Sequence, residues 1–394
     1  MLDKIIFLLN SPYPYYTGGR ETWLNNVANC LIDQYEIVVI AENSINIDNL
    51  TSRWKIDSRI RIINVKSLLS YRITNWLLRS YLDYYHCFFR AAMMRRALLR
   101  QVRNGQKTYI IAMDTVFLPL VFRRLKKNDC IETIISSRGP HAEIYGSNWP
   151  LKKKRILKIE RKNLTVADRI WSNGYDTQLL LQNKGFASTV IYNGVDCKHI
   201  MNESLPPHKA IQAARGIRIG TIGTLLDLKG YPIMIHAIKR VIELQPGIDI
   251  DLFAFGKGDS YGYEQLAKSI GVERNIHFLG EDKDAPLYIK QTDLLLALGT
   301  SEGSGMSMAA LEMLASGVPV IATNIPCYQQ LIENGKNGFL VSEGDANELA
   351  KLILYVVRIS QDEKEQIRKE AFKRCWQFDW AQVERRIINE LEKR

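Results

Sequence analysis

The stretch that decides the fold is residues 301–323, which read SEGSGMSMAALEMLASGVPVIAT. It follows a short apolar run, DLLLALG at 293–299, which suits a strand buried on both faces. Small residues then allow a sharp turn, and a helix is predicted to begin near Gly305. Gly317 and Pro319 are predicted to end that helix before a second strand. The order of strand, glycine loop, helix and strand predicts a parallel α/β unit.

The predicted start of this helix is a place for an anion. The first turn of a helix has free N–H groups and a partial positive charge, so the amides of Gly305, Met306, Ser307 and Met308 are predicted to bind a diphosphate. Glu312 lies two turns further along, where a carboxylate can accept hydrogen bonds from a ribose diol. Phosphate and sugar together indicate a nucleotide-sugar site. The alternative is an ordinary crossover without a ligand, because glycine loops recur in parallel sheets.

The rest of the chain alternates predicted strands with predicted helices, which is typical of doubly wound parallel sheets. Strands are predicted at 4–10, 36–42, 59–65, 108–114, 132–138, 169–174, 189–194, 217–223, 250–256, 275–280, 293–299, 319–323 and 338–341. Helices are predicted at 20–33, 70–103, 115–127, 150–167, 175–184, 229–245, 261–270, 305–316, 326–333, 345–359 and 362–393. The polar stretch at 197–215 breaks this rhythm and is predicted to be a linker.

Residues 301–323 resemble the donor site of the family 4 retaining glycosyltransferases, which have the GT-B fold. The family pattern holds two glutamates eight residues apart, and Glu312 with the following MLASGVPVIAT matches the second. Ser304 stands eight residues before Glu312, and Glu302 stands ten before it. Either Ser304 has replaced the first glutamate, or a longer loop lets Glu302 contact the transferred sugar.

The resemblance covers essentially the whole chain and implies two Rossmann-like domains that face each other across a cleft. It implies an acceptor-binding domain at 1–196, the linker at 197–215 and a donor-binding domain at 216–377. The segment at 378–394 resembles the family's closing helix, which crosses back to the first domain.

A second donor motif, GTLLDLKG at 223–230, follows the first strand of the second half. The family pattern is Gly-Arg-Leu, three residues and Lys-Gly, in which Arg and Lys neutralise the donor diphosphate. Lys229 and Gly230 match, whereas Thr224 stands at the arginine position. The alternative for Lys229 is a solvated lysine at the start of a helix.

Three further glycine loops resemble parts of the same site. Gly18 and Gly19 follow the first strand and resemble the loop beside the transferred sugar, although a plain turn is the alternative for this pair. Gly256 and Gly280 match the loops that flank the nucleotide base.

The acceptor site is predicted in SSRGPHAE at 136–143, after a strand whose carboxyl end should face the cleft. The resemblance implies that Arg138 holds an anionic group of a substrate and that His141 orients the acceptor hydroxyl or the donor sugar. A structural role is the alternative for His141.

The net charge of +11 is unevenly distributed along the chain. Residues 1–200 contain 30 Lys and Arg against 16 Asp and Glu, whereas residues 201–394 contain 23 against 26. In the segment 70–103, Arg72, Arg79 and Arg90 fall on one helical face among aromatic residues. This pattern favours an anionic membrane surface as a partner, and a core helix with a solvated basic face is the alternative.

Other features restrict the class of protein. The six cysteines are scattered without metal-binding spacing, which indicates a reducing cytosol and no zinc site. The N-terminus lacks the pattern of a signal peptide, and no apolar run is long enough to span a membrane. Asp249-Ile250-Asp251 spells a DxD motif, but it opens a predicted strand, and GT-B enzymes do not need a metal there.

We therefore expect a cytoplasmic glycosyltransferase, possessing no cofactor or metal, that moves a sugar from a nucleoside diphosphate to a glycan or lipid-linked acceptor. Thr224 and Ser304 differ from the family pattern, so one alternative is a degenerate subunit that binds the donor but does not catalyse sugar transfer. An epimerase of the same fold is another alternative. The basic first half also allows nucleic-acid binding, but no recognition motif supports it.

Overall fold

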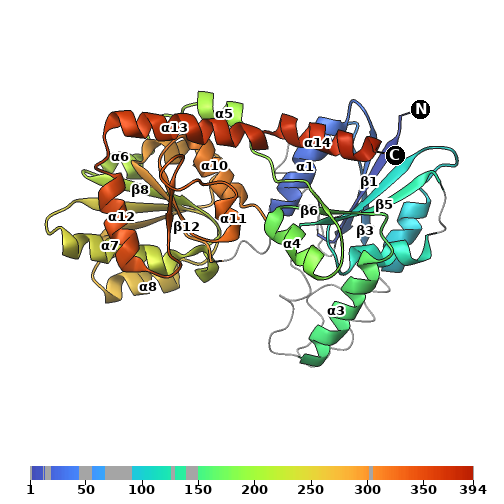
Figure 1. Ribbon diagram of the computed structural model, residues 1–394, viewed down its shortest axis with the longest axis horizontal. Helices are drawn as coiled ribbons and strands as arrows, with labels where there is room; N and C mark the ends of the chain where they lie inside the picture. The colour runs from blue at the N-terminus through green and yellow to red at the C-terminus, as the bar shows by residue number, and fades with distance from the viewer. Residues whose placement is uncertain are drawn as a thin grey trace. The chain divides into compact units, whose positions relative to one another are not determined.

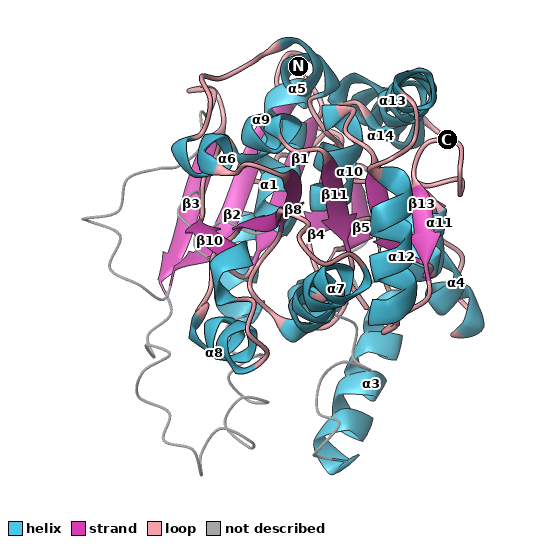
Figure 2. Ribbon diagram, turned by 90° about the vertical axis from the view of Figure 1, so that its left-hand side faces the viewer, coloured by secondary structure: helices cyan, strands magenta, loops and turns pink. Residues whose placement is uncertain are grey.

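The computed structural model describes residues 2–11, 13, 19–43, 56–66, 91–125, 129–138, 150–300 and 305–393. Its internal contacts divide the chain into two compact units. The first comprises Met1–Tyr192, Gly303–Gly305 and Val383–Arg394, and the second comprises Asn193–Glu302 and Met306–Gln382. Each unit has a parallel sheet with helices packed on it (Figure 1 and Figure 2). The predicted pair of α/β units is confirmed.

The sheet of the first unit has seven described strands in the order β3-β2-β1-β4-β5-β6-β7. Its strands are β1 (Lys4–Leu9), β2 (Glu36–Asn43), β3 (Arg61–Lys66), β4 (Thr108–Ala112), β5 (Ile131–Ser137), β6 (Arg169–Ser172) and β7 (Thr189–Val190). Its helical segments are α1 (Gly19–Leu31), the 3₁₀ helix η1 (Leu118–Arg124), α3 (Pro150–Leu164) and α4 (Tyr175–Asn183).

The central strand β1 shows why this order forms. Every residue of its sequence KIIFLL is buried, because β1 pairs in parallel with β2 on one side and β4 on the other. A strand buried on both faces needs a continuous apolar run. The one charged residue, Lys4, donates to the carbonyl oxygen of Gln101 at 2.7 Å and lies 3.3 Å from the Glu36 carboxylate.

The sheet of the second unit has six strands in the order β10-β9-β8-β11-β12-β13. These strands are β8 (Ile217–Ile222), β9 (Ile250–Phe255), β10 (Ile276–Gly280), β11 (Leu294–Ala297), β12 (Val320–Thr323) and β13 (Phe339–Val341). The order runs in one direction from β8 to β10 and in the other from β11 to β13. The reversal between β8 and β11 is the switch point at which doubly wound sheets bind ligands.

The helices of the second unit cover both faces of this sheet (Figure 1). They are α5 (Cys197–Asn202), α6 (Lys209–Ala213), α7 (Tyr231–Leu244), α8 (Tyr261–Ser269), α9 (Ala285–Tyr288), α10 (Met308–Ser316), α11 (Pro326–Gln329), α12 (Ala346–Val356) and α13 (Gln361–Cys375). Short 3₁₀ segments are η2 (Asp227–Lys229), η3 (Glu273–Asn275), η4 (Ile289–Gln291) and η5 (Trp376–Phe378). The last helix is α14 (Trp380–Glu392), whose residues from Val383 onward belong to the first unit.

Some predicted boundaries differ from the structure. The helix expected at 115–127 is the shorter 3₁₀ helix η1, since Asp114 accepts the N–H groups of Val116, Phe117 and Leu118 and Pro119 follows. The helix expected near Gly305 begins at Met308 instead.

One further prediction differs from the structure. The predicted linker at 197–215 contains the helices α5 and α6 and lies within the second unit. The tail predicted to be helical at 362–393 consists of α13, η5 and α14. The polar composition of 197–215 did not indicate these short helices. Helices of this length depend on packing against the rest of the protein more than on their own helix propensity.

The structure does not describe every residue of the predicted sites. Outside the described residues lie Gly18, Arg72, Arg79, Arg90, His141, Glu302 and Ser304. Within the described ranges, no helix combines the length and apolar character needed to cross a bilayer.

Candidate functional site

A small cavity opens at the switch point of the second sheet. Strands β8 and β11 are paired in parallel, so their carboxyl ends lie together. The residues around the cavity come from these strand ends, the loops that follow them, helix α10 with its N-cap, and α11; they are Thr221, Ile222, Lys229, Leu296, Ala297, Leu298, Gly299, Ser307, Ala309, Ala310, Met313 and Tyr328. The structure therefore brings together Lys229 and Ser307, which the sequence assigned to one donor site.

The turn that carries Lys229 is locked against the loop after β11. Lys229 is the last residue of η2, and Gly230 follows with a left-handed φ of 82°. A β-carbon at Gly230 would lie 2.3 Å from the carbonyl oxygen of Leu298, so only glycine fits there. The N–H of Thr300 also donates to the carbonyl oxygen of Leu228 at 2.8 Å. These contacts fix the Lys229 backbone beside the cavity.

The loops that follow β8, β9 and β10 interlock at the same edge. The N–H of Gly223 donates to Phe255, the N–H of Leu225 donates to Lys257, and the N–H of Gly256 donates to Gly280, each to the carbonyl oxygen at 2.8–2.9 Å. A β-carbon at Gly256 would lie 1.7 Å from the carbonyl oxygen of Gly223. Gly256 is therefore required by the close approach of two backbones. Gly280 is exposed and has open space around its α-carbon.

The residues before α10 are held by several partners. Ser307 is the N-cap, and its side chain accepts the N–H of Ala310 at 3.3 Å. The carbonyl oxygen of buried Met306 accepts a hydrogen bond of 2.6 Å from the Asn193 side-chain amide. Gly305 is grouped with the first unit, where its N–H donates to Asp176 at 2.8 Å. Of the four amides predicted to bind a diphosphate, the Gly305 amide is thus occupied by a carboxylate in this structure.

Glu312 occupies a site that disfavours a charge. It lies on α10 between Leu311 and Met313, which are both buried. Burial raises the pKa of Glu312 to about 7, so its surroundings favour the neutral carboxyl group over the carboxylate. A ligand that donates hydrogen bonds to this carboxylate would stabilise its charged form.

No metal site accompanies this cavity in the described part of the chain. The described residues contain no group of three His, Cys, Asp or Glu side chains placed to hold a metal ion. Asp251, the second carboxylate of the DxD motif, accepts a contact of 2.7 Å from the His277 ring of the neighbouring strand. That carboxylate has a structural partner within the sheet.

Arg138 is engaged inside the first unit. Its guanidinium lies 3.6 Å from the centre of the Trp23 ring, and it donates to the Ser136 hydroxyl at 3.0 Å and to the carbonyl oxygen of Ile191 at 2.5 Å. Burial lowers the pKa of Arg138. These contacts tie β5 to α1 and to the segment after β7. The guanidinium therefore has a structural role in addition to the predicted contact with an anionic substrate.

Sequence reasoning missed a polar cluster at the carboxyl ends of β1 and β4. The side-chain amide of Asn10 donates to Asp114 at 3.0 Å, while the other Asp114 oxygen caps η1. Nearby, Ser11 donates to buried Glu21 at 2.5 Å, and Arg20 contacts the same carboxylate at 2.9 Å. The Asn10 side-chain oxygen is buried and has no hydrogen-bond partner among the described residues. Such an oxygen is a ready acceptor for a substrate hydroxyl.

Tyr328 was also missed in the donor cavity. It is buried, lines the cavity, and its hydroxyl accepts the N–H of Gly299 at 3.3 Å. Its sequence context, PCYQQ at 326–330, has no recurring pattern that would reveal this role. Only the packing of α11 against the end of β11 brings it there.

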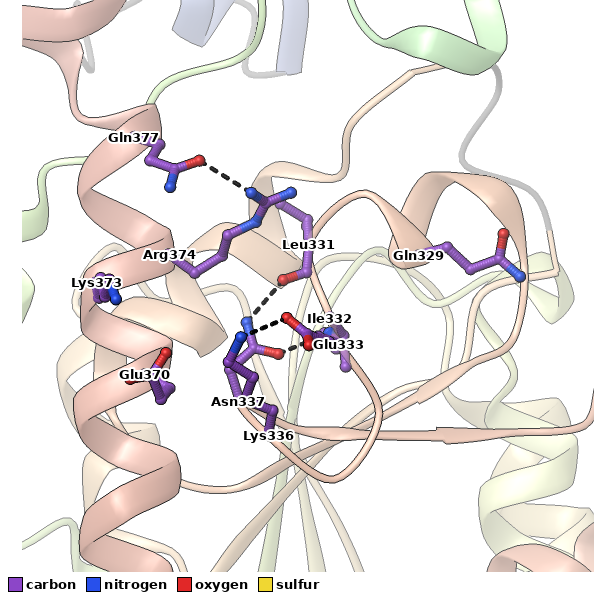
Figure 3. A pocket seen from close by; sticks show the side chains of 10 residues that line it. All are labelled: Gln329, Leu331, Ile332, Glu333, Lys336, Asn337, Glu370, Lys373, Arg374 and Gln377. Atoms are coloured by element: carbon purple, nitrogen blue, oxygen red, sulfur yellow. Dashed lines mark hydrogen bonds and ion pairs between the residues drawn. The ribbon is translucent and has the colours of Figure 1, made fainter.

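A second, larger hollow of the same unit lies between α13 and the segment 329–337 (Figure 3). Figure 3 shows that most of its polar side chains already bond to one another or to the backbone. Lys336 contacts Glu333 at 2.9 Å, Arg374 donates to Gln377 at 2.9 Å, and Asn337 donates to the carbonyl oxygen of Leu331 at 2.9 Å. These partners leave few polar groups to recognise a ligand. The hollow contains no residue that the sequence assigned to the site.

The close approach at Gly256 gives a testable prediction. Gly256→Ala should destabilise the second unit and weaken nucleotide binding, because a methyl group would collide with the backbone of Gly223. Urea denaturation should show a loss of roughly 2–4 kcal/mol, a size typical of overpacking with backbone strain.

The matched control for Gly256→Ala is Gly262→Ala in the next helix, α8, where nothing lies within 4 Å of the added methyl group. Gly262→Ala should be neutral or slightly stabilising, since alanine is the better helix former. If Gly256→Ala unfolds with the wild-type midpoint, the interlocking of the loops does not constrain the site.

Comparisons with known proteins agree with this geometry. Residues 216–358 match the family described as "Glycosyl transferases group 1". The protein CapJ of Staphylococcus aureus is 28% identical over 243 residues, which are 59% of this chain and 58% of CapJ. An uncharacterized glycosyltransferase of Haemophilus influenzae is 24% identical over 341 residues, 85% of each chain. The lipopolysaccharide core biosynthesis glycosyltransferase LpsE of Rhizobium meliloti is 28% identical over 137 residues, 35% of this chain and 38% of LpsE.

The chain thus spans a little over half the length of CapJ and less than half that of LpsE. Among solved structures, Anabaena HepE in complex with UDP superposes with a TM-score of 0.70 over 98% of this chain and 99% of HepE, at 18% sequence identity. At this identity the likeness shows the fold, which is GT-B. Residues 216–358, which contain the cavity at the switch point, therefore match a glycosyltransferase family model within a chain of GT-B fold.

Proposed function

We propose that this protein transfers a sugar from a nucleoside diphosphate to a hydroxyl acceptor, with retention of the anomeric configuration. The observation that carries the proposal is the cavity in which Lys229 and the capped start of α10 lie at one switch point. A cation and a helix N-terminus on one cavity suit a diphosphate. The domain match over 216–358 and the complex of HepE with UDP support a uridine diphosphate sugar as donor.

The residues would act mainly by electrostatics. Lys229 and the free amides at the start of α10 would stabilise the negative charge that develops on the leaving diphosphate. Glu312 would accept hydrogen bonds from the ribose, and Glu302 or Ser304 would contact the transferred sugar. Thr224 replaces the second cation of the family pattern, so Lys229 would carry a larger share of the charge stabilisation. No step in this scheme requires a metal ion.

The acceptor would bind to the first unit. The buried oxygen of Asn10, which has no hydrogen-bond partner among the described residues, and the adjacent Asp114 carboxylate could position a hydroxyl. The basic excess of residues 1–200 suits an anionic acceptor. LpsE acts in lipopolysaccharide core biosynthesis, which supports an envelope glycan or a lipid-linked glycan as the acceptor class. His141 would orient the acceptor hydroxyl or the donor sugar.

Thermal-shift screening tests the donor class directly. A ligand that binds the native state raises the melting temperature by mass action, so UDP should raise it more than GDP or ADP. Release of UDP from a UDP-sugar should then follow when acceptor is added. A protein that binds UDP but never releases it from any UDP-sugar would instead be the degenerate subunit, and interconversion of two UDP-sugars would indicate an epimerase.

Lys229→Ala should weaken binding of the donor and slow transfer. A hydrogen bond to a charged group contributes about 1.5–3 kcal/mol, so the dissociation constant for UDP should rise by roughly 10- to 100-fold. Isothermal titration calorimetry measures this change. Lys239→Ala is the matched control, because Lys239 lies on α7 in an ion pair 3.8 Å from Glu243 and is not among the residues around the cavity. Equal affinities in the two variants would refute the assignment of Lys229.

Glu312 makes stability depend on pH in an unusual direction. Because the pKa of Glu312 is raised from 4.5 to about 7, the folded protein binds this proton more tightly than the unfolded chain does. The contribution of the protonated Glu312 carboxyl group to the free energy of unfolding is therefore lost as the pH rises from about 4.5 through about 7. Glu312→Gln cannot lose this proton, so it should melt above the wild type at pH 8, and the difference should shrink towards pH 5.

The same residue should make donor binding depend on pH. UDP-glucose carries no phosphate that titrates between about pH 6 and 8, so a change in its affinity reports on the protein. The wild type should bind UDP-glucose more tightly as Glu312 ionises, whereas Glu312→Gln should bind weakly and without this dependence. Parallel pH profiles for the two proteins would show that Glu312 does not contact the nucleotide.

We also propose a peripheral association of the first half with an anionic membrane surface at the cytoplasmic face. The support is the sequence pattern of Arg72, Arg79 and Arg90 with aromatic residues, together with the basic excess of residues 1–200. Each basic residue near an anionic leaflet contributes about 1 kcal/mol, and salt screens this attraction.

Liposome flotation tests the membrane association. Binding should require anionic lipid, fall at high salt, and fall again when Arg72, Arg79 and Arg90 are changed to Glu. The matched control changes Lys283, Lys351 and Lys369 of the second unit, all exposed, to Glu. If both triple variants float equally well, net charge rather than this segment controls binding, and a wild type that ignores anionic liposomes at low salt refutes the association.

A further inference from the structure

Two cysteines far apart in the sequence meet in the second unit. The sulfur atoms of Cys197 and Cys375 are 3.3 Å apart, although 178 positions separate them in the chain. Cys197 is the first residue of α5 and Cys375 is the last residue of α13, which lie next to each other in Figure 1. Both residues are fully buried, and both are free thiols in this structure. A disulfide bond is about 2.05 Å long, so the sulfur atoms need to approach by little more than about 1 Å.

The backbone around the pair is already aligned. The segment after β7 runs beside the end of α13: the N–H of Val195 donates to Phe378 at 3.0 Å, and the N–H of Cys197 donates to the Asp379 carboxylate at 3.3 Å. Val195 and Asp379 also form a parallel bridge. These backbone contacts join the residues around Cys197 to those just after Cys375. They therefore hold the two cysteines close together.

The pair also touches the donor helix. The Cys375 thiol donates to the carbonyl oxygen of Leu311 at 3.7 Å, within the range of a sulfur hydrogen bond. Leu311 precedes Glu312 on α10, and α10 packs against both α5 and α13. Oxidation would remove the hydrogen that Cys375 donates and would draw α5 towards α13. Both changes act on the helix whose start lines the cavity.

We propose that Cys197 and Cys375 are a redox-sensitive modification site, at which a reversible disulfide lowers the affinity for the nucleotide donor. The oxidant would be hydrogen peroxide. The sulfur of one cysteine attacks a peroxide oxygen, the O–O bond breaks, and a sulfenic acid and one water form. The sulfur of the second cysteine then attacks the sulfenic sulfur, and the oxygen leaves with the second thiol proton as another water. Two electrons pass from the thiols to the peroxide, and a dithiol reductant reverses the change.

The effect on donor affinity rests on the proposed function of the cavity, whereas disulfide formation does not. Peptide mapping without reductant tests formation: treatment with hydrogen peroxide should yield one cross-linked pair of peptides containing Cys197 and Cys375, lost on reduction. A cross-link over so long a loop should also raise the melting temperature by roughly 5 °C or more. Absence of this cross-linked pair would overturn the proposal.

Calorimetry on the oxidised and reduced protein tests the coupling to the donor site. The dissociation constant for UDP should rise by roughly three- to tenfold on oxidation and recover with dithiothreitol. Cys197→Ser is the decisive control, because it retains the Cys375 thiol that donates to Leu311 but cannot form the disulfide. Cys327→Ser should respond to oxidation like the wild type, since Cys327 lies on α11 and is not a member of the pair.

The two parts of the proposal fail separately. A cross-linked protein that binds UDP with unchanged affinity would overturn the coupling while leaving the cysteine pair in place. A protein that forms the cross-link but binds no nucleotide in either state would overturn the function proposed for the cavity. If Cys197→Ser loses UDP affinity under peroxide as the wild type does, another cysteine is responsible and the pair is only part of the core.

Discussion

The backbones of Gly223 and Gly256 meet at the carboxyl edge of the second sheet, so closely that a β-carbon at Gly256 would lie 1.7 Å from the Gly223 carbonyl oxygen. This contact exists because β8 and β9 are adjacent parallel strands, and the loops that follow them leave the sheet at the same edge. The backbone of the loop after β9 therefore restricts the course of the loop after β8, which continues into η2. That path delivers Lys229 to the cavity at the switch point, next to the N-cap of α10.

Helix α10 combines two requirements that oppose each other. Its residues Leu311, Met313, Leu314 and Ala315 are buried, because the helix packs between the sheet and its neighbours α5 and α13. The same burial raises the pKa of Glu312 and disfavours the charge that a ribose would need as a hydrogen-bond acceptor. A buried carboxylate lowers the free energy of unfolding of the ligand-free protein. A ligand that donates hydrogen bonds to the carboxylate offsets this loss. Such sites are a usual place for binding residues.

The first unit shows a different use of buried polar groups. Arg138 stacks on Trp23 and donates to two oxygen atoms, so it joins β5 to α1 and to the segment after β7. Arginine suits this role because its planar guanidinium can stack and donate at the same time. By contrast, the side-chain oxygen of Asn10, at the ends of β1 and β4, has no hydrogen-bond partner among the residues that the structure describes. In this unit the buried guanidinium of Arg138 therefore has protein partners, whereas the side-chain oxygen of Asn10 is available to accept a hydrogen bond from a ligand.

The sequence by itself determined the fold class and the order of the elements. Buried parallel strands need continuous apolar runs, and these runs, such as DLLLALG, are visible without the structure. It also predicted Lys229 and Glu312 as donor-binding residues, because each stands in a motif that resembles the donor site of the glycosyltransferase family.

Only the tertiary structure decided which residues meet across long separations. The contact of Cys197 with Cys375, the place of Tyr328 beside Gly299, and the partners of Arg138 depend on how elements pack, which no local pattern encodes. The raised pKa of Glu312 is of the same kind, since it comes from the neighbours that surround the carboxyl group. The periodicity of apolar residues and the spacing of motif residues predict the contacts that a residue makes within its own helix, strand or turn. The free energy of a buried charge or thiol depends on segments that approach from elsewhere in the chain.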